Sequence, residues 1–104
     1  MADGFEDVCT LYQIPDGGVR MVEAGGRDVL LSRFGTSVYA VGGNCTHAMA
    51  SLDDARIDGD ILTCSHHGAR FDRKTGRSLS GACPNLPVYQ VRVVGNLVEV
   101  KVRG

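Results

Sequence analysis

The chain has 104 residues, 43% of them hydrophobic and 22% charged, which is typical of a single globular domain and unlike a disordered segment. Eleven Lys and Arg residues against 12 Asp and Glu residues give a formal net charge of −1, which excludes a net basic field for binding nucleic acid or an anionic membrane. No stretch approaches the roughly 18 apolar residues of a membrane-spanning helix, and the acidic segment 1–7 lacks a signal peptide's apolar run, so we expect a cytoplasmic protein.

The N-terminal part of the chain is predicted to form β-strands joined by tight turns. Cys9 is expected in a first strand, as a small apolar residue. Segments 19–23, 28–34 and 37–41 are candidate strands separated by Gly25-Gly26 and Gly35-Thr36, so they are predicted to form a meander.

The middle of the chain, from Gly42 to about Ala82, interrupts this pattern because it is rich in Gly, Asp, Ser and Arg. Only segment 61–63 is strand-like there, and segment 53–57 is expected to form at most one turn of helix. Two groups of charged residues are expected to be solvated loop charges: Arg70, Arg73, Lys74 and Arg77, and Asp53, Asp54, Asp58 and Asp60.

The C-terminal part contains the clearest predicted hairpin. Segments 88–94 and 97–102 are joined by Gly95-Asn96, a two-residue turn that tolerates positive φ. The second of these strands is predicted to bury one face. With strands on both sides of the irregular middle, the chain is predicted to be an all-β protein.

Every histidine of the chain lies beside one of two cysteines. The middle segment contains Cys45-Thr46-His47, then sixteen residues, then Cys64-Ser65-His66-His67-Gly68. A Cys and a His at alternate positions point the same way at a separation set by the backbone, which suits two adjacent metals bridged by sulfide. The pattern indicates a [2Fe–2S] centre with Cys45 and Cys64 on one iron, and His47 with a histidine of the second loop on the other.

Two alternatives use the same residues without iron. A zinc-stabilised interaction module is the alternative of another class, but zinc sites usually pair Cys with Cys and His with His at their own spacings. A purely structural role would make the placement of all three histidines beside two cysteines an accident. Cys9 and Cys83 have no neighbouring partner and are predicted to be ordinary residues rather than ligands.

The pattern resembles the Rieske family, whose motif is C-x-H, about 15 to 17 residues, and C-x-x-H. The framing residues also match: Asn44, Gly68, Phe71-Asp72, Thr75-Gly76 and the segment Gly81-Ala82-Cys83-Pro84. Because the family places glycine directly after the last ligand, the resemblance selects His67 and leaves His66 solvated. It implies one Rieske-type [2Fe–2S] cluster per chain, bound by Cys45, His47, Cys64 and His67.

The resemblance also implies a fold. We expect one domain over 1–104, an antiparallel β-sandwich or barrel with a small cluster-binding subdomain of two loops at about 43–82. Met49 and Pro84 are expected to shield the cluster, with His47 and His67 at its exposed edge.

The ligand set bears on the reduction potential. Two neutral imidazoles in place of two thiolates leave the oxidised centre about neutral, which raises the potential to roughly −150 to +300 mV from about −400 mV. High-potential members of the family add a disulfide between the loops and two hydroxyl groups bonded to sulfur. The resemblance places Ala50 and His66 where those cysteines would be, and Ala69 and Phe71 where the hydroxyls would be. We therefore expect a potential near the low end.

The remaining residues exclude catalysis by this chain alone. After His47 and His67 are used, only His66 is left, so no second iron site of two histidines and a carboxylate can form, and no glycine fingerprint for a nicotinamide or flavin occurs. The chain is similar to the ferredoxin components of bacterial aromatic-ring-hydroxylating dioxygenase systems. That similarity implies a monomeric carrier between an NAD(P)H-dependent ferredoxin reductase and a terminal oxygenase. A nitrite reductase small subunit or the ferredoxin of a monooxygenase is the alternative.

Overall fold

The computed structural model describes residues 4–44, 51–52, 55–64, 68–79 and 84–102. These ranges contain nine β-strands and one short 3-10 helix, η1, so the predicted all-β fold is confirmed. The elements are β1 (Glu6–Thr10), η1 (Leu11–Gln13), β2 (Val19–Ala24), β3 (Arg27–Phe34), β4 (Ser37–Gly42), β5 (Arg56–Asp58), β6 (Ile61–Thr63), β7 (Arg70–Asp72), β8 (Val88–Val94) and β9 (Leu97–Lys101). No helical segment in the described ranges has the length and hydropathy that crossing a bilayer requires.

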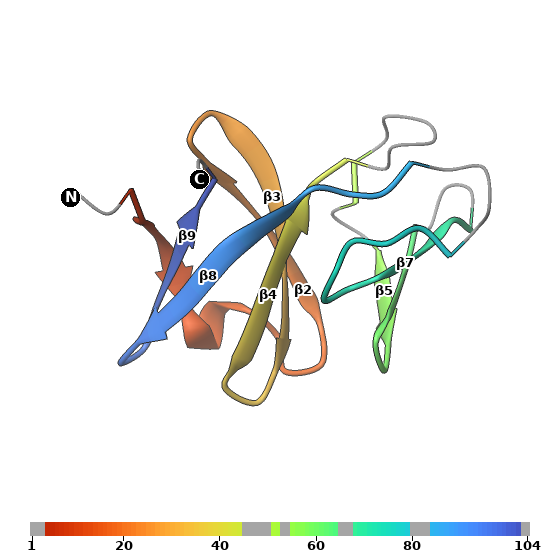
Figure 1. The fold of residues 1–104 in the computed structure, drawn as a ribbon. Coiled ribbons are helices and arrows are strands. Elements are labelled where there is room, and N and C mark those ends of the chain that lie inside the picture. The colour runs from red at the N-terminus through yellow and green to blue at the C-terminus, as the bar shows by residue number, and fades with distance from the viewer. Residues whose placement is uncertain (1–3, 45–50, 53–54, 65–67, 80–83, 103–104) are drawn as a thin grey trace.

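Six strands form one antiparallel sheet in the order β1-β9-β8-β4-β3-β2, which curls into a nearly closed barrel (Figure 1). Two three-stranded halves, β1-β9-β8 and β4-β3-β2, are joined by a short pairing of Ala40 with Tyr89 and of Val41 with Val88. Opposite this junction, β1 and β2 approach each other without forming a ladder. The barrel is therefore held closed by side chains along one seam.

The predicted meander and the predicted C-terminal hairpin are both present. Strands β2, β3 and β4 are consecutive neighbours, and β8 pairs with β9. Gly25 and Gly26 in the first turn have φ of 58° and 76°, and Gly95 in the last has φ of 62°, the left-handed region that favours glycine. Val98 and Val100 of β9 are fully buried, which confirms the predicted buried face.

A second antiparallel sheet, β5-β6-β7, lies beside the barrel (Figure 1). Its strands have three residues each, and β6 coincides with the predicted strand 61–63. The expected helical turn over 53–57 is wrong at Arg56 and Ile57, which belong to β5, while Asp53 and Asp54 lie outside the described residues. Three residues are too few to show an alternating pattern, so strand pairing rather than local sequence defines β5 and β7.

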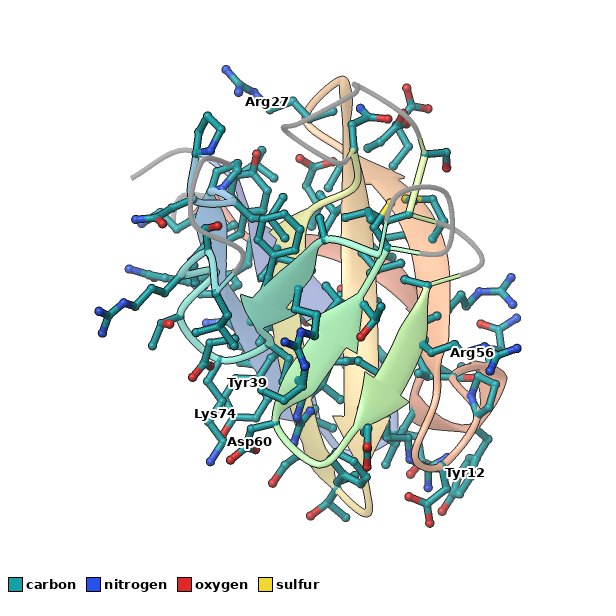
Figure 2. All side chains as sticks on the ribbon, turned by 90° about the vertical axis from the view of Figure 1, so that its right-hand side faces the viewer. Tyr12, Arg27, Tyr39, Arg56, Asp60 and Lys74 are labelled. Atoms are coloured by element: carbon teal, nitrogen blue, oxygen red, sulfur yellow. The ribbon has the colours of Figure 1, made fainter. Side chains whose placement is uncertain are left out.

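Strand β3 is buried on both faces and separates two hydrophobic cores. Val29 and Leu31 face the barrel interior with Val98 and Val100, because alternate residues of a strand point to opposite faces. Leu30 faces the second core, which lies between the barrel and the small sheet. In Figure 2 the small sheet lies in front of the barrel strands. The other buried members of this second core are Val41, Leu52, Ala55, Leu62, Cys64, Ala69, Phe71 and Leu86.

Backbone hydrogen bonds hold the segment in which the chain returns from the small sheet to the barrel. The Asp72 carbonyl accepts a hydrogen bond from Gly76 N (2.7 Å), and the Gly76 carbonyl accepts one from Leu86 N (2.7 Å). The Pro87 carbonyl accepts one from Gly42 N (2.8 Å). Gly76 has φ of 72°, and a Cβ there would collide with the Leu86 carbonyl oxygen. Both the backbone angle and the close approach therefore require glycine at position 76.

We predict that Gly76→Ala destabilises the fold more than Gly59→Ala. Gly59, in the β5–β6 turn, also has positive φ (61°), but an added Cβ would meet nothing within 4 Å. Gly59→Ala should therefore cost only the left-handed penalty, about 1 kcal/mol in the free energy of unfolding. Gly76→Ala adds the collision with Leu86 and should cost about 3 kcal/mol. Urea unfolding followed by circular dichroism measures both costs, and equal losses would contradict the collision.

Candidate metal centre

The structure describes one of the predicted ligands, Cys64. The other three, Cys45, His47 and His67, lie outside the described residues, as do Met49, Ala50, His66 and Cys83. Their roles stay predictions. The described residues on either side of the two ligand loops show how the ends of each loop are held.

The second loop is closed by hydrogen bonds that continue the β6/β7 hairpin. Cys64 follows β6 directly, and its backbone N donates to the Ala69 carbonyl (2.8 Å), one step beyond the pairing of Thr63 with Arg70. Gly68 N donates to the Cys64 carbonyl (2.9 Å). Gly68 has φ of 68°, a left-handed conformation that reverses the chain and favours glycine. The two ends of the C-x-x-H segment, at Cys64 and Gly68, are thus joined at the end of the β6/β7 hairpin.

The Cys64 side chain is fully buried, at 0% exposure, in the second hydrophobic core. It forms no disulfide. Cysteine sulfur is a ligand that iron accepts, and a water-excluded position shields such a bond from solvent. The environment of Cys64 therefore suits a metal ligand shielded from water.

The first loop is closed at the end of β4. Asn44 and Ser51 form an isolated antiparallel bridge, and Leu52 N donates to the Gly43 carbonyl (2.8 Å). Gly43 N in turn donates to the Asp28 carbonyl of β3 (2.9 Å). A Cβ on Gly43 would lie 2.6 Å from the Met21 sulfur, so glycine permits this close approach. Leu52 is buried in the same core as Cys64, so the bases of the two loops share one core.

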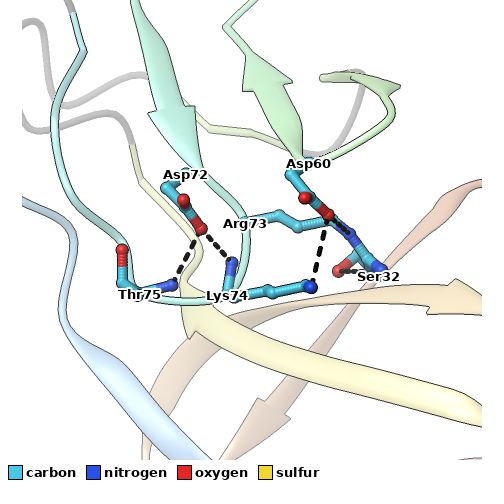
Figure 3. A network of polar contacts seen from close by, with 6 residues as sticks. All are labelled: Ser32, Asp60, Asp72, Arg73, Lys74 and Thr75. Atoms are coloured by element: carbon cyan, nitrogen blue, oxygen red, sulfur yellow. Dashed lines mark hydrogen bonds and ion pairs between the residues drawn. The ribbon is translucent and has the colours of Figure 1, made fainter.

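Four of the framing residues of the motif lie in β7 and in the turn that follows it. One carboxylate oxygen of Asp72, Oδ1, accepts hydrogen bonds from Lys74 N (2.8 Å) and Thr75 N (3.2 Å), as Figure 3 shows. This side chain caps the turn that leads into Gly76. The sequence Phe71-Asp72 and Thr75-Gly76 thus shapes the return of the chain from the small sheet to the barrel.

The residues predicted to replace sulfur-bonding hydroxyls lie close to the Cys64 backbone. Ala69 pairs with Cys64 at the hairpin end and is 4% exposed, and Phe71 is fully buried opposite Leu62 of β6. Neither the Ala69 nor the Phe71 side chain carries a hydrogen-bond donor, and both lie in the same hydrophobic core as Cys64.

One of the expected loop charges is buried. Arg73 is 4% exposed, so its assignment as a solvated residue is wrong, whereas Lys74 and Asp60 are exposed as predicted. Its guanidinium lies between the rings of Phe34 and Tyr39, at 4.1 and 4.7 Å from the ring centroids. Sequence inspection missed this residue because its partners come from distant strands. No local signal marks it, because β7 has the sequence Arg-Phe-Asp and only Phe71 in it is buried.

The remaining cysteine in the described residues is not placed near this centre. Cys9 lies in β1, as predicted, and is half-buried against the barrel core. Burial raises the pKa of its thiol, so it stays protonated at neutral pH. Within the described ranges, no group of three or more His, Cys, Asp or Glu residues forms another metal site.

A family model for the Rieske [2Fe-2S] domain matches residues 5–91. The match runs from β1 into β8 and includes both predicted ligand loops. It confirms the predicted family and implies a Rieske-type [2Fe–2S] cluster as the cofactor. The described donor fits that cluster, since the Cys64 sulfur is buried and such clusters are held by cysteine sulfur.

Individual relatives agree with this match. The chain is 33% identical over 101 residues to the ferredoxin component of a naphthalene 1,2-dioxygenase system of Pseudomonas aeruginosa, covering 96% of this chain and 97% of the relative. It is 35% identical over 88 residues to the ferredoxin CarAc of Metapseudomonas resinovorans, with 83% and 82% covered.

A solved structure gives the same result. The ferredoxin of carbazole 1,9a-dioxygenase from Nocardioides aromaticivorans IC177 superposes with a TM-score of 0.88 at 31% identity, covering 95% of this chain and 98% of that chain. The matched fold extends well beyond the ligand motif. The chain therefore belongs to the Rieske [2Fe-2S] domain family.

Proposed function

We propose that the chain is a low-potential Rieske-type ferredoxin that carries one electron from an NAD(P)H-dependent reductase to a terminal ring-hydroxylating oxygenase. The observation that carries this proposal is the near-complete overlap with free-standing ferredoxins, 98% of the carbazole dioxygenase ferredoxin. A ferredoxin in complex with its oxygenase, from a carbazole 1,9a-dioxygenase, also matches at a TM-score of 0.85 and 33% identity. In contrast, the chain covers 30% of a terminal oxygenase from Novosphingobium sp. KA1, whose 22% identity supports the fold alone.

The proposed ligands are Cys45 and Cys64 on one iron, and His47 and His67 on the other. When bound, the cluster takes up and releases a single electron. The buried position of Cys64 supports this division, because it places thiolate away from solvent and leaves the imidazoles for the exposed edge. Pro84 is exposed and is proposed to cover the cluster together with Met49.

The low potential is supported by the surroundings of Cys64. Hydrogen bonds to cluster sulfur stabilise the reduced state and raise the potential. Ala69 and Phe71 hold the positions proposed for such donors, and neither side chain can donate a hydrogen bond. With Ala50 and His66 in place of a disulfide pair, we propose a potential near the low end of the Rieske range, roughly −150 mV.

The proposed setting is a monomer in the cytoplasm, where a reducing environment keeps the ligand cysteines as thiols. A nitrite reductase small subunit or a monooxygenase ferredoxin shares the domain, but the names of the relatives favour a dioxygenase partner. The matched family model favours an iron–sulfur centre over a zinc-stabilised interaction module.

The carrier function is tested by reconstitution. The purified chain, a ferredoxin reductase and a naphthalene or carbazole dioxygenase are mixed with NADH, and hydroxylated product is measured. Product should rise in proportion to the added chain and remain near background without it. Reduction of the chain by the reductase without any product from these oxygenases would contradict the proposed partner.

The ligand assignment predicts opposite results for two adjacent histidines. His67→Ala should lose the Rieske absorption and the electron paramagnetic resonance (EPR) signal, because one iron loses an imidazole. His66→Ala should retain both, with two irons and two acid-labile sulfides per chain. Iron and sulfide analysis of each purified variant gives the measurement. Loss of the cluster in His66→Ala, and its retention in His67→Ala, would exchange the two assignments.

The reduction potential is predicted to rise when a hydroxyl group is introduced at position 69. The wild-type midpoint should lie near the low end of the range, and Ala69→Ser should raise it by tens of millivolts by adding a donor beside the cluster. The wild-type midpoint should also become more negative toward about pH 10, as the imidazole ligands lose their protons. Protein-film voltammetry measures both. A wild-type midpoint well above zero, or one that is flat with pH, would refute this account.

A further inference from the structure

Arg73 is a buried charged residue that joins the small sheet to the barrel. It follows β7, and its Nη1 donates a hydrogen bond to Ser32 Oγ of β3 (3.1 Å; Figure 3). Its guanidinium also contacts the rings of Phe34 in β3 and Tyr39 in β4. Cation–π contacts strengthen when water is excluded, and Arg73 is only 4% exposed. The residue thus makes directional contacts from the small sheet to two barrel strands.

The position of Arg73 is opposite to that of Cys64 along the small sheet. Arg73 N donates to the Asp60 carbonyl (2.9 Å), one step beyond the pairing of Ile61 with Asp72. Cys64 lies one step beyond the other end of the same ladder. The ladder between them has three residue pairs, a length of about 10 Å. The β6/β7 hairpin is therefore a short, fully bonded unit with Arg73 at one end and Cys64 at the other.

The two ligand loops start from different sheets. The first is closed at the end of β4, in the barrel, and the second at the end of the β6/β7 hairpin, in the small sheet. Their separation therefore depends on how the small sheet lies on β3. The apolar contacts of the second core draw the two sheets together, but hydrophobic attraction is non-directional and leaves sliding or rotation weakly opposed.

The ion pair with Asp60 adds little to this contact. Arg73 Nε and Asp60 Oδ1 are 3.8 Å apart, the Asp60 side chain is 58% exposed, and no hydrogen bond to Nε is formed among the described residues. An exposed partner at this distance contributes little net free energy. The contacts that orient Arg73 are thus those to Ser32, Phe34 and Tyr39, all of which belong to the barrel.

We propose that Arg73 is a positioning residue for the cluster, which sets the separation of the two ligand loops by fixing the small sheet against the barrel. The inference rests on the proposed function, because it takes both loops as ligand loops. Because the Asp60 carboxylate is exposed, replacing Arg73 with an apolar side chain leaves no unpaired buried charge, so the effect is expected on cluster geometry more than on folding.

The test compares Arg73→Met with Arg73→Lys and two controls. Methionine retains an unbranched stem between the rings but loses the charge and the hydrogen bond to Ser32. Lysine retains the charge but loses the planar group that lies against the rings. Arg56→Met removes an exposed arginine of β5 in the same sheet, and Gly59→Ala lowers the stability of that sheet without changing its contacts with the barrel.

The readouts are the EPR spectrum of the reduced protein and the rate of iron release to a chelator. Arg73→Met should shift or broaden the EPR signal and release iron roughly tenfold faster, the lower end of losses seen for outer-shell supports of metal sites. Arg73→Lys should resemble Arg73→Met, whereas Arg56→Met and Gly59→Ala should keep the wild-type spectrum. Ser32→Ala removes only the hydrogen bond, so it should change the EPR signal and the iron-release rate in the same direction as Arg73→Met but by less. It serves as the test if Arg73→Met fails to fold.

Three results would overturn the proposal. One is a wild-type spectrum and release rate in Arg73→Met. Another is wild-type behaviour in Arg73→Lys, which would show that charge alone is needed. A Gly59→Ala spectrum changed as much as that of Arg73→Met would show that any destabilisation of the small sheet suffices. Failure of the proposed function is distinct, because the wild-type chain itself would then lack iron and acid-labile sulfide.

Discussion

Strand β3 contributes buried side chains to both hydrophobic cores. Its inward residues, Val29 and Leu31, close the barrel, while Leu30 and Ser32 face the small sheet. A strand with apolar contacts on both faces cannot shift register by one residue without exchanging these two sets of contacts. This double burial draws the small sheet, and with it the base of the second predicted ligand loop, onto the barrel. The first loop is tied to the same strand, through the hydrogen bond from Gly43 to Asp28.

The base of the candidate centre is shielded from water, because Cys64 is fully buried. Backbone hydrogen bonds join the two described ends of each predicted ligand loop. Such an arrangement limits reorganisation when the charge of a bound cluster changes by one electron. The proposed low potential rests on Ala69 and Phe71, whose side chains have no donor for a hydrogen bond to cluster sulfur.

Much of this protein was predictable because its signals are local. The meander and the C-terminal hairpin follow from short strand-like segments between glycine turns, which act within a few residues. The spacing of the two Cys–His loops is equally local, and it is sufficient to identify the family. The strands β5 and β7 were missed because three residues carry no readable period, and they exist only through pairing with β6.

The sequence by itself determined the kind of fold, the family and the kind of cofactor, because turn chemistry and ligand spacing are properties of short segments. Only the tertiary structure decided which charges are buried and how the two loop bases meet. Arg73 is part of a basic run in the sequence, and its burial depends on Ser32, Phe34 and Tyr39, which are 34 or more residues away. No local pattern encodes such contacts, because they arise when one sheet packs on another.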